Sequence, residues 1–179
     1  MYYCYADSPV GKLLLAGTKN SLHMLSFETS KVPLIPLENW QYKPEYFANC
    51  VQQLDEYFAG HRQYFDIPYT LTGTEFQQDV LNSVAKIKYG QTVAYSAIAS
   101  KVHKPTAVRA VGMANARNKL PIIIPCHRVI GKNGSLTGFG GGIETKRYLL
   151  GLENLSSNLK YKAGTLIHTS LINLQNNSI

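Results

Sequence analysis

The chain is organised around one stretch, Pro121-Ile122-Ile123-Ile124-Pro125-Cys126-His127-Arg128-Val129. Its three consecutive isoleucines predict a short buried strand. Proline cannot donate to a hydrogen-bonded ladder, so the strand is confined between Pro121 and Pro125. Cys126 is therefore expected where a rigid strand gives way to a loop, a place where a thiol is held firmly and can still face a pocket.

Two interpretations of Cys126 stand side by side. A lone free cysteine is most often a small hydrophobic residue in the core. The alternative is a reactive thiol assisted by His127, but successive side chains of a strand point to opposite faces. The two side chains can cooperate if the chain leaves the extended conformation at Pro125, or if a bridging water carries the proton.

Length and composition set the class of protein. The 179 residues suffice for one domain or for two small domains that share an interface, and a hydrophobic fraction of 45% supports a packed core. The formal net charge of +7, from 18 Lys and Arg against 11 Asp and Glu, favours polyanionic partners such as nucleic acid. Charge alone is a weak signal, because many solvated surfaces are mildly basic.

The three cysteines, Cys4, Cys50 and Cys126, do not form a disulfide framework, since their number is odd and their spacing irregular. Neither a Cys-x-x-Cys nor a His-x-x-x-His pair occurs, so no bound metal is expected. The N-terminus lacks the regions of a signal peptide, and no apolar run is long enough to span a membrane. These features predict a soluble, reduced protein of the cytoplasm that does not contact membranes.

Residues 1–67 are predicted to form an α/β domain with a small antiparallel sheet and one helix. Strand-like runs alternate with turn residues at Tyr2–Tyr5, Lys12–Ala16 and Leu22–Phe27. Residues 31–43 are expected to be a loop. Pro44 suits the first turn of a helix, and Gly60 suits its C-terminal end.

Residues 68–155 are predicted to form a mainly α-helical domain that contains a helix-turn-helix. Thr74 and Gln77 match a capping box that opens the first helix. Two further helices are expected at 93–102 and 106–116, separated by a short break. Short helices joined by a tight turn favour a helix-turn-helix, although an αα-hairpin without a DNA role fits the pattern equally well.

The third of these helices carries small side chains on one face. Ala107, Ala110 and Ala114 follow one another at i, i+3 and i+7, and Gly112 adds another bare position. Small residues allow a helix backbone to approach a partner closely. Arg109 is the only long cation in the first two turns, which favours a polyanion as the neighbour of this face.

Glycines gather in the loop 135–142, which holds four of them around Phe139. Such a loop can bring backbone amides close to a flat ligand, although a flexible surface loop has the same composition. Glu144 is expected to begin a last helix. Glu153 lies near the end of that helix, where a carboxylate opposes the helix dipole, so a compensating role is expected for it. The polar segment 156–179 has no assignment.

Taken together, these residues resemble the O6-alkylguanine-DNA alkyltransferase family. The segment from Pro125 to Val129 is similar to the family's active-site signature, and four more motifs occur in the family's order and spacing. They are Gly73-Thr74-Glu75-Phe76-Gln77, Tyr89-Gly90-Gln91-Thr92, Arg109-Ala110-Val111-Gly112 and Gly138-Phe139-Gly140-Gly141. The resemblance is strong from about Gly73 to Glu153 and loose in the N-terminal part.

The resemblance implies direct-reversal DNA repair. An alkyl group would pass irreversibly from O6-alkylguanine, or from O4-alkylthymine, to Cys126, once per protein molecule and without a cofactor. The protein would bind double-stranded DNA as a monomer, entering the minor groove with weak sequence preference and flipping the damaged base out of the stack.

Matched positions imply roles for individual residues. His127, through a water, and Glu153 would help to form the thiolate, and Asn118 would brace the turn before the active site. Tyr95 would assist rotation of the nucleotide and departure of guanine, and Arg109 would fill the space left by the flipped base. Further DNA contacts would come from Ala107, Ala110, Gly112, Tyr95 and Arg128. The substrate pocket would be lined by Phe139, Gly140, Val129 and Asn115.

The chemistry requires a reactive thiolate. A free cysteine with a pKa of ~8.5 is only a few per cent thiolate at pH 7, and lowering that pKa by ~2 units, or ~2.7 kcal/mol, makes the thiolate the major form. The S-alkyl product is a thioether that does not hydrolyse, which explains a single turnover. Two positions depart from the family: Phe139 stands where tyrosine is common, and Lys119 stands where proline is frequent.

Three alternatives belong to other classes. A non-catalytic binder of alkylated DNA would not need Cys126. A helix-turn-helix regulator would need neither a buried thiol nor a glycine-rich loop. A cysteine hydrolase usually brings its nucleophile and base together from distant positions rather than from adjacent ones such as Cys126 and His127.

Overall fold

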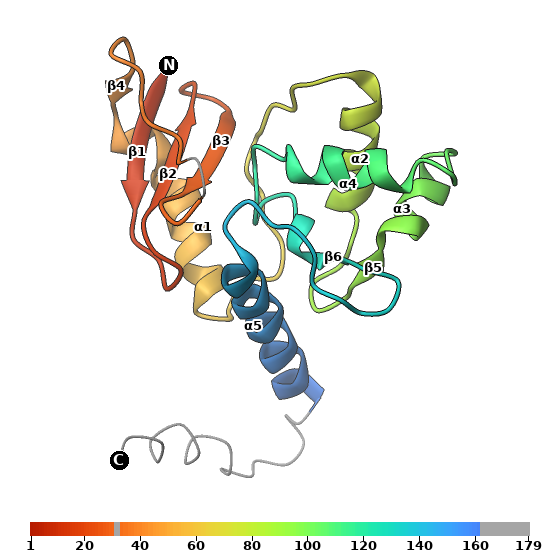
Figure 1. Cartoon of the computed structure of the whole chain (residues 1–179). Coiled ribbons are helices and arrows are strands. Elements are labelled where there is room, and N and C mark those ends of the chain that lie inside the picture. Colours follow the sequence, from red (N-terminus) through yellow and green to blue (C-terminus); the bar gives the residue numbers. More distant parts are fainter. Residues whose placement is uncertain (31–32, 162–179) are drawn as a thin grey trace.

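The computed structural model describes residues 1–30 and 33–161. One group of elements, from the N-terminal part, is a small sheet with a helix packed against it, and a second group consists mainly of helices (Figure 1). The last helix, α5 (Ile143–Tyr161), begins where the two groups meet (Figure 1). None of the helices in the described ranges is long and apolar enough to cross a bilayer.

The N-terminal sheet has the strand order β3-β2-β1-β4. Its strands β1 (Tyr2–Ala6), β2 (Leu13–Gly17) and β3 (Leu22–Phe27) are antiparallel, as predicted. The two-residue strand β4 (Gln41–Tyr42) pairs parallel with β1, so the sheet is mixed and the expected loop 31–43 contains a strand. This pairing arises because Gln41 N donates to Met1 O and Lys43 N donates to Tyr3 O.

A helix follows the sheet, as the sequence indicates. The 3-10 turn η1 (Pro44–Phe47) leads into α1 (Ala48–Phe58), and Gly60 after it has a φ of 76°, a left-handed conformation that glycine adopts without a steric cost. The helix buries Cys50, Gln53, Leu54 and Tyr57. Leu54 joins the strand residues of the hydrophobic core.

The second group begins with α2 (Glu75–Ala85), whose capping box is complete: Thr74 Oγ1 accepts from Gln77 N, and Gln77 Oε1 accepts from Thr74 N. The short helix α3 (Tyr95–Lys101) and the helix α4 (Val108–Ala116) then form the predicted pair. The second helix starts at Tyr95 rather than near residue 93, because β5 (Val93–Ala94) pairs parallel with β6 (Val129–Ile130).

The predicted strand at 122–124 is wrong. The segment is buried as expected, but it forms a tight turn closed by a bond from Ile124 N to Leu120 O, and Ile122 adopts a φ of 73°. The Asn118 side chain holds both ends of this turn, since its Oδ1 accepts from Leu120 N and its Nδ2 donates to Ile124 O, each at 2.9 Å. These bonds and the surrounding core stabilise a conformation that a β-branched residue rarely adopts.

Helix α5 begins one residue before the expected Glu144 and continues to Tyr161. The segment left unassigned by the sequence, 156–179, therefore starts inside a helix. Its remainder, 162–179, lies outside the described residues.

Candidate active site

Cys126 begins a 3-10 helix, η2 (Cys126–Arg128), and not a loop after a strand. The chain leaves the extended conformation at Pro125, whose φ and ψ are −79° and 62°. This was the first of the two conditions under which the neighbouring thiol and imidazole can cooperate. Both side chains are enclosed by the fold: Cys126 is 4% exposed and His127 is 0% exposed.

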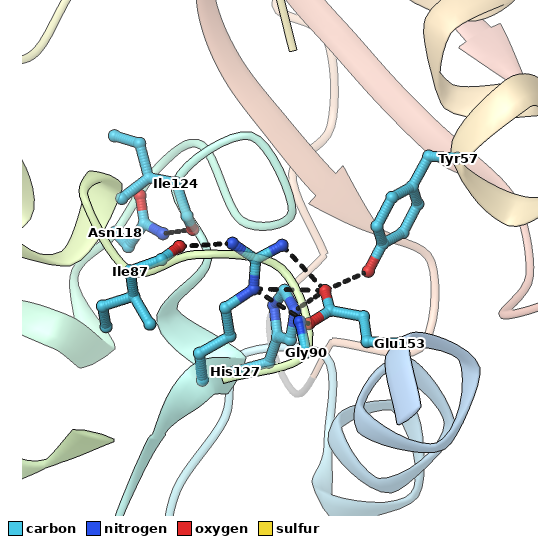
Figure 2. Close-up of polar contacts among 8 residues, drawn as sticks. Tyr57, Ile87, Gly90, Asn118, Ile124, His127 and Glu153 are labelled. Atoms are coloured by element: carbon cyan, nitrogen blue, oxygen red, sulfur yellow. Dashed lines mark hydrogen bonds and ion pairs between the residues drawn. The ribbon is translucent and has the colours of Figure 1, made fainter. Parts of the chain in front are cut away.

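Glu153 of α5 is the centre of a polar network that includes His127, the residue next to Cys126 (Figure 2). Its Oε1 lies 2.8 Å from His127 Nε2 and accepts from the Tyr57 hydroxyl at 2.8 Å. Arg128 donates from Nη2 to Oε1 and from Nε to Oε2, each at 2.9 Å, and Gly90 N donates to Oε2 at 3.1 Å. Both carboxylate oxygens are thus held by donors from separate segments.

The network fixes the protonation of His127. Burial alone would raise the pKa of Glu153, but its hydrogen bonds and charge interactions with His127 and Arg128 lower it to about 2, so the group is a carboxylate at neutral pH. Burial lowers the pKa of His127, which keeps the imidazole neutral. Since a carboxylate only accepts, Nε2 carries the proton and Nδ1 is the acceptor nitrogen. Nδ1 has no hydrogen-bond partner among the described residues.

The thiol of Cys126 is not a resting thiolate. Burial raises the pKa of Cys126 to about 11, and this outweighs a hydrogen bond from Asn118 and the positive charge of Lys146, which both act to lower it. The expected decrease in the pKa of Cys126 is therefore wrong for the free protein, because loss of hydration penalises the anion more than its neighbours stabilise it. The proton has to leave during the reaction.

The guanidinium of Arg128 is directed into the protein. The residue is 6% exposed, and besides the pair with Glu153 its Nη1 donates to Ile87 O at 2.6 Å. This geometry does not fit the expected contact of Arg128 with DNA. The guanidinium instead compensates the buried carboxylate of Glu153. Arg128 also lies over the ring of Tyr89, 5.7 Å from the centroid.

Two asparagines flank Cys126. Asn118 braces the turn described above, in keeping with its expected place before the active site. Asn115 of α4 is 3% exposed, and its Nδ2 donates to Cys126 O at 3.3 Å. Its Oδ1 has no hydrogen-bond partner among the described residues. The structure thus places Asn115 directly against Cys126, and its expected place in a substrate pocket stays a prediction.

The N-terminal sheet supports the glycine-rich loop. The ring of Phe139 is half-buried, with its centroid 5.5 Å from that of Phe27 in β3 and 6.3 Å from that of His127. Gly141 also lies against Phe27, since a Cβ at this position would come within 2.7 Å of that ring. The other two expected pocket residues differ in exposure: Gly140 is exposed, whereas Val129 is fully buried in β6.

Four of the expected DNA-binding residues lie on or next to α4. Arg109 and Ala110 are exposed, and Ala107 and Gly112 are half-buried. Gly112 faces the ring of Tyr95, because a Cβ there would lie 4.0 Å from two ring carbons. Ala114, which the spacing placed with Ala107 and Ala110, is instead buried in the core.

Two family models account for most of the chain. The 6-O-methylguanine DNA methyltransferase ribonuclease-like domain matches residues 1–71, and the DNA binding domain of the same name matches residues 75–155. This chain belongs to the 6-O-methylguanine-DNA methyltransferase family. The resemblance inferred from its motifs is confirmed, and its activity is direct-reversal repair, the transfer of an alkyl group from DNA to a cysteine of the protein.

Relatives of this methyltransferase share nearly its whole described length. The methylated-DNA–protein-cysteine methyltransferase of Methanosarcina acetivorans is 44% identical and covers 86% of this chain and 98% of its own length. That of Mycobacterium leprae is 48% identical over 86% of this chain and 93% of its own. The crystal structure of Mycobacterium tuberculosis OGT in complex with DNA superposes with a TM-score of 0.82, at 44% identity over 87% of this chain and 94% of that one. These matches support the predicted two-part fold and DNA binding.

Two residues of this methyltransferase site were missed in the sequence. Tyr57 lies on the buried side of α1, where a phenol has to find a hydrogen-bond partner. Lys146 is fully buried, and its Nζ donates to Val129 O at 2.7 Å and to Thr137 O at 3.0 Å. The burial of Lys146 could have been predicted from the sequence, because Lys146, Leu149 and Glu153 follow the i, i+3, i+7 spacing of one helix face.

Proposed function

We propose that Cys126 is the alkyl acceptor and that His127 is its general base. The observation that carries this proposal is the bond from His127 Nε2 to Glu153 Oε1, which leaves Nδ1, on the residue next to the thiol, as the basic nitrogen. The carboxylate stabilises the imidazolium that forms when Nδ1 takes a proton. His127 and Glu153 thus act as the base and its orienting group.

The transfer starts from a neutral thiol and a neutral imidazole. The Cys126 proton passes through a water to His127 Nδ1 as the sulfur attacks the alkyl carbon. The new S–C bond forms while the C–O6 bond of the alkylated guanine breaks, and the electron pair stays on the base. Coupling the two events avoids a free buried thiolate, which at pH 7 and a pKa of about 11 would cost about 5 kcal/mol. The thioether product ends the reaction after one turnover.

Departure of guanine is assisted by Tyr95. Its phenol is half-buried at the start of α3, and the Thr137 hydroxyl of the glycine-rich loop lies 3.5 Å from it. A phenol beside the glycine-rich loop can donate to a guanine held there as negative charge develops on the departing base. The same geometry serves O4-alkylthymine, whose leaving oxygen is also part of a delocalised ring.

DNA binding is assigned to the exposed face of α4. Arg109 is the exposed cation at the start of this helix, next to the small residue Ala110, so the helix can lie close to the minor groove while the guanidinium enters the duplex. Phosphate contacts give affinity without reading the sequence, and base flipping costs a few kcal/mol that these contacts offset. We therefore propose weak sequence preference, strong salt dependence and action as a monomer.

The acceptor must stay reduced. Cys4, Cys50 and Cys126 are all free and buried in the structure, and an alkyl transfer to sulfur requires that Cys126 is not oxidised. We therefore place the reaction in the cytoplasm, where thiols are kept reduced.

A mass measurement tests the proposal. Wild-type protein is incubated with duplex DNA that contains one O6-methylguanine, and the peptide that contains Cys126 is weighed. We expect a one-methyl gain on that peptide alone and none in Cys126→Ala, while the matched control Cys50→Ala reacts like wild type. Removal of the lesion by Cys126→Ala would contradict the assignment, and binding without a mass gain would favour a non-catalytic reader of alkylated DNA.

A further inference from the structure

Tyr57 brings a phenol from the N-terminal part of the chain into the active site. The residue is 0% exposed, and its hydroxyl donates to Glu153 Oε1 at 2.8 Å. The same oxygen lies 2.8 Å from His127 Nε2. Figure 2 shows Tyr57 and His127 both directed at Glu153. A carboxylate only accepts, so the phenol and the imidazole are two donors that meet at one atom.

We propose that Tyr57 is a positioning residue for alkyl transfer: its hydroxyl holds Glu153 Oε1 in the place from which the carboxylate orients His127. The proposal rests on the roles proposed above for Cys126, His127 and Glu153. Tyr57 does not touch the thiol, and it acts through the carboxylate.

Packing alone does not explain the hydroxyl. The ring of Tyr57 is already surrounded by aromatic rings, with centroids 5.4 Å away at Phe58 and Phe65 and 6.1 Å away at Tyr89. A phenylalanine would make the same contacts without burying a polar group. Tyrosine is used where its hydroxyl has a defined partner, and here the partner is an ionised carboxylate, which makes the bond stronger than one between neutral groups.

The hydroxyl adds a restraint on Oε1 to those that the other donors supply. Arg128 bonds both oxygens and neutralises the charge, and Gly90 N fixes Oε2. Tyr57 adds its own hydrogen bond to Oε1, the oxygen that faces His127. Burial beside Glu153 raises the pKa of Tyr57 well above its ordinary value, so the phenol remains a donor over the whole working pH range.

Loss of this donor changes the basicity of His127 in a known direction. With one donor fewer, Oε1 attracts the imidazole proton more strongly, which favours the imidazolium and moves the titration of His127 to higher pH. Burial acts in the opposite direction, as do the positive charges of Arg128 and Lys146. Tyr89 is a further titratable group that packs against Tyr57. A substitution at Tyr57 leaves all of these in place.

The test uses single-turnover transfer from methylated duplex DNA as a function of pH. For Tyr57→Phe we expect the rate at saturating DNA to fall about tenfold, part of the 10²- to 10⁴-fold that general-base catalysis contributes. The DNA concentration for half-saturation should not change, and the midpoint of the acid limb should move up by ~0.5 pH unit. Tyr46→Phe is the matched control, because it removes the same atom from a ring that packs on Tyr2.

The outcomes separate this proposal from the function itself. Absence of alkyl on Cys126 of the wild-type protein would overturn the proposed function, whereas a Tyr57→Phe rate within twofold of wild type would overturn only the role of Tyr57. A slower rate with an unmoved midpoint would also overturn it, since that result indicates general loosening. Should Tyr57→Phe fold poorly, 3-fluorotyrosine at this position keeps the shape and strengthens the donor; the midpoint must then move to lower pH.

Discussion

Arg128 and Glu153 form a buried, two-pronged ion pair in which Nε lies 2.9 Å from Oε2 and Nη2 lies 2.9 Å from Oε1. The side chains are 7% and 1% exposed, so neither charge is compensated by water. The position next to His127 is therefore occupied by a residue whose guanidinium holds Glu153, the carboxylate that contacts the proposed base. The contribution of Arg128 to stability can be measured separately from DNA binding.

We expect Arg128→Met to destabilise the protein by about 3–5 kcal/mol, because it leaves a buried carboxylate without its counter-charge. Arg128→Lys should restore only part of this stability, since an ammonium cannot match the two-pronged geometry. Chemical unfolding measures both effects. DNA affinity, measured below the unfolding transition, should be unchanged in Arg128→Lys and reduced in Arg109→Ala. A reduced affinity in both variants would show that Arg128 does contact DNA.

Stability should depend on pH through Glu153. The pKa of this group is about 2 in the folded protein, below the ~4.3 of an unfolded glutamate, so its contribution is present above pH ~4.3 and is lost as the pH falls toward 2. The difference corresponds to about 3 kcal/mol. The gap in unfolding free energy between wild type and Glu153→Gln should thus shrink between pH 5 and 2. A gap that stays constant across this range would mean that the carboxylate is not specially stabilised.

Lys146 should assist formation of the thiolate. Its positive charge acts to lower the pKa of Cys126, and its ammonium also ties Val129 O to Thr137 O. Lys146→Met is expected to raise the pKa of Cys126 further and to slow alkyl transfer about tenfold, which corresponds to the loss of ~1.4 kcal/mol of thiolate stabilisation. The single-turnover rate against pH measures this. Lys132→Met, in the exposed turn before the glycine-rich loop, is the control and should react at the wild-type rate.

Phe139 should support the glycine-rich loop through its contact with Phe27. Phe139→Ala removes a half-buried ring and is expected to cost about 2 kcal/mol of stability, less than the 3–5 kcal/mol of a fully buried aromatic residue. Phe139→Tyr keeps the ring and should remain within about 0.5 kcal/mol of wild type. Thermal unfolding compares the two. Transfer from methylated and benzylated DNA by Phe139→Tyr then shows whether a hydroxyl at this position changes which alkyl groups are accepted. Equal stability of Phe139→Ala and Phe139→Tyr would show that the contact with Phe27 does not support the glycine-rich loop.

Local features of the sequence predicted local structure well. The capping box at Thr74 and Gln77 and the turn at Gly60 occur where their residue types require them, because each depends on contacts within a few residues. The isoleucines at 122–124 were wrongly predicted to form a strand. Their burial was predicted correctly, but their conformation depends on Asn118, which lies outside the apolar run and holds it in a turn.

The sequence by itself determined which chemical groups are available: a free thiol, a neighbouring imidazole, a carboxylate on the last helix, and an arginine on a helix of small residues. The expected position of Glu153 near the end of that helix is wrong, because α5 continues to Tyr161. Only the tertiary structure decided how these groups are connected. Tyr57 meets Glu153 across 96 positions of the chain, and Arg128 meets it across 25. Such contacts follow from the packing of α1, η2 and α5 around one carboxylate, and burial there also decides that Cys126 rests as a thiol. Neither the distance between remote segments nor the loss of hydration is encoded in the spacing of nearby residues.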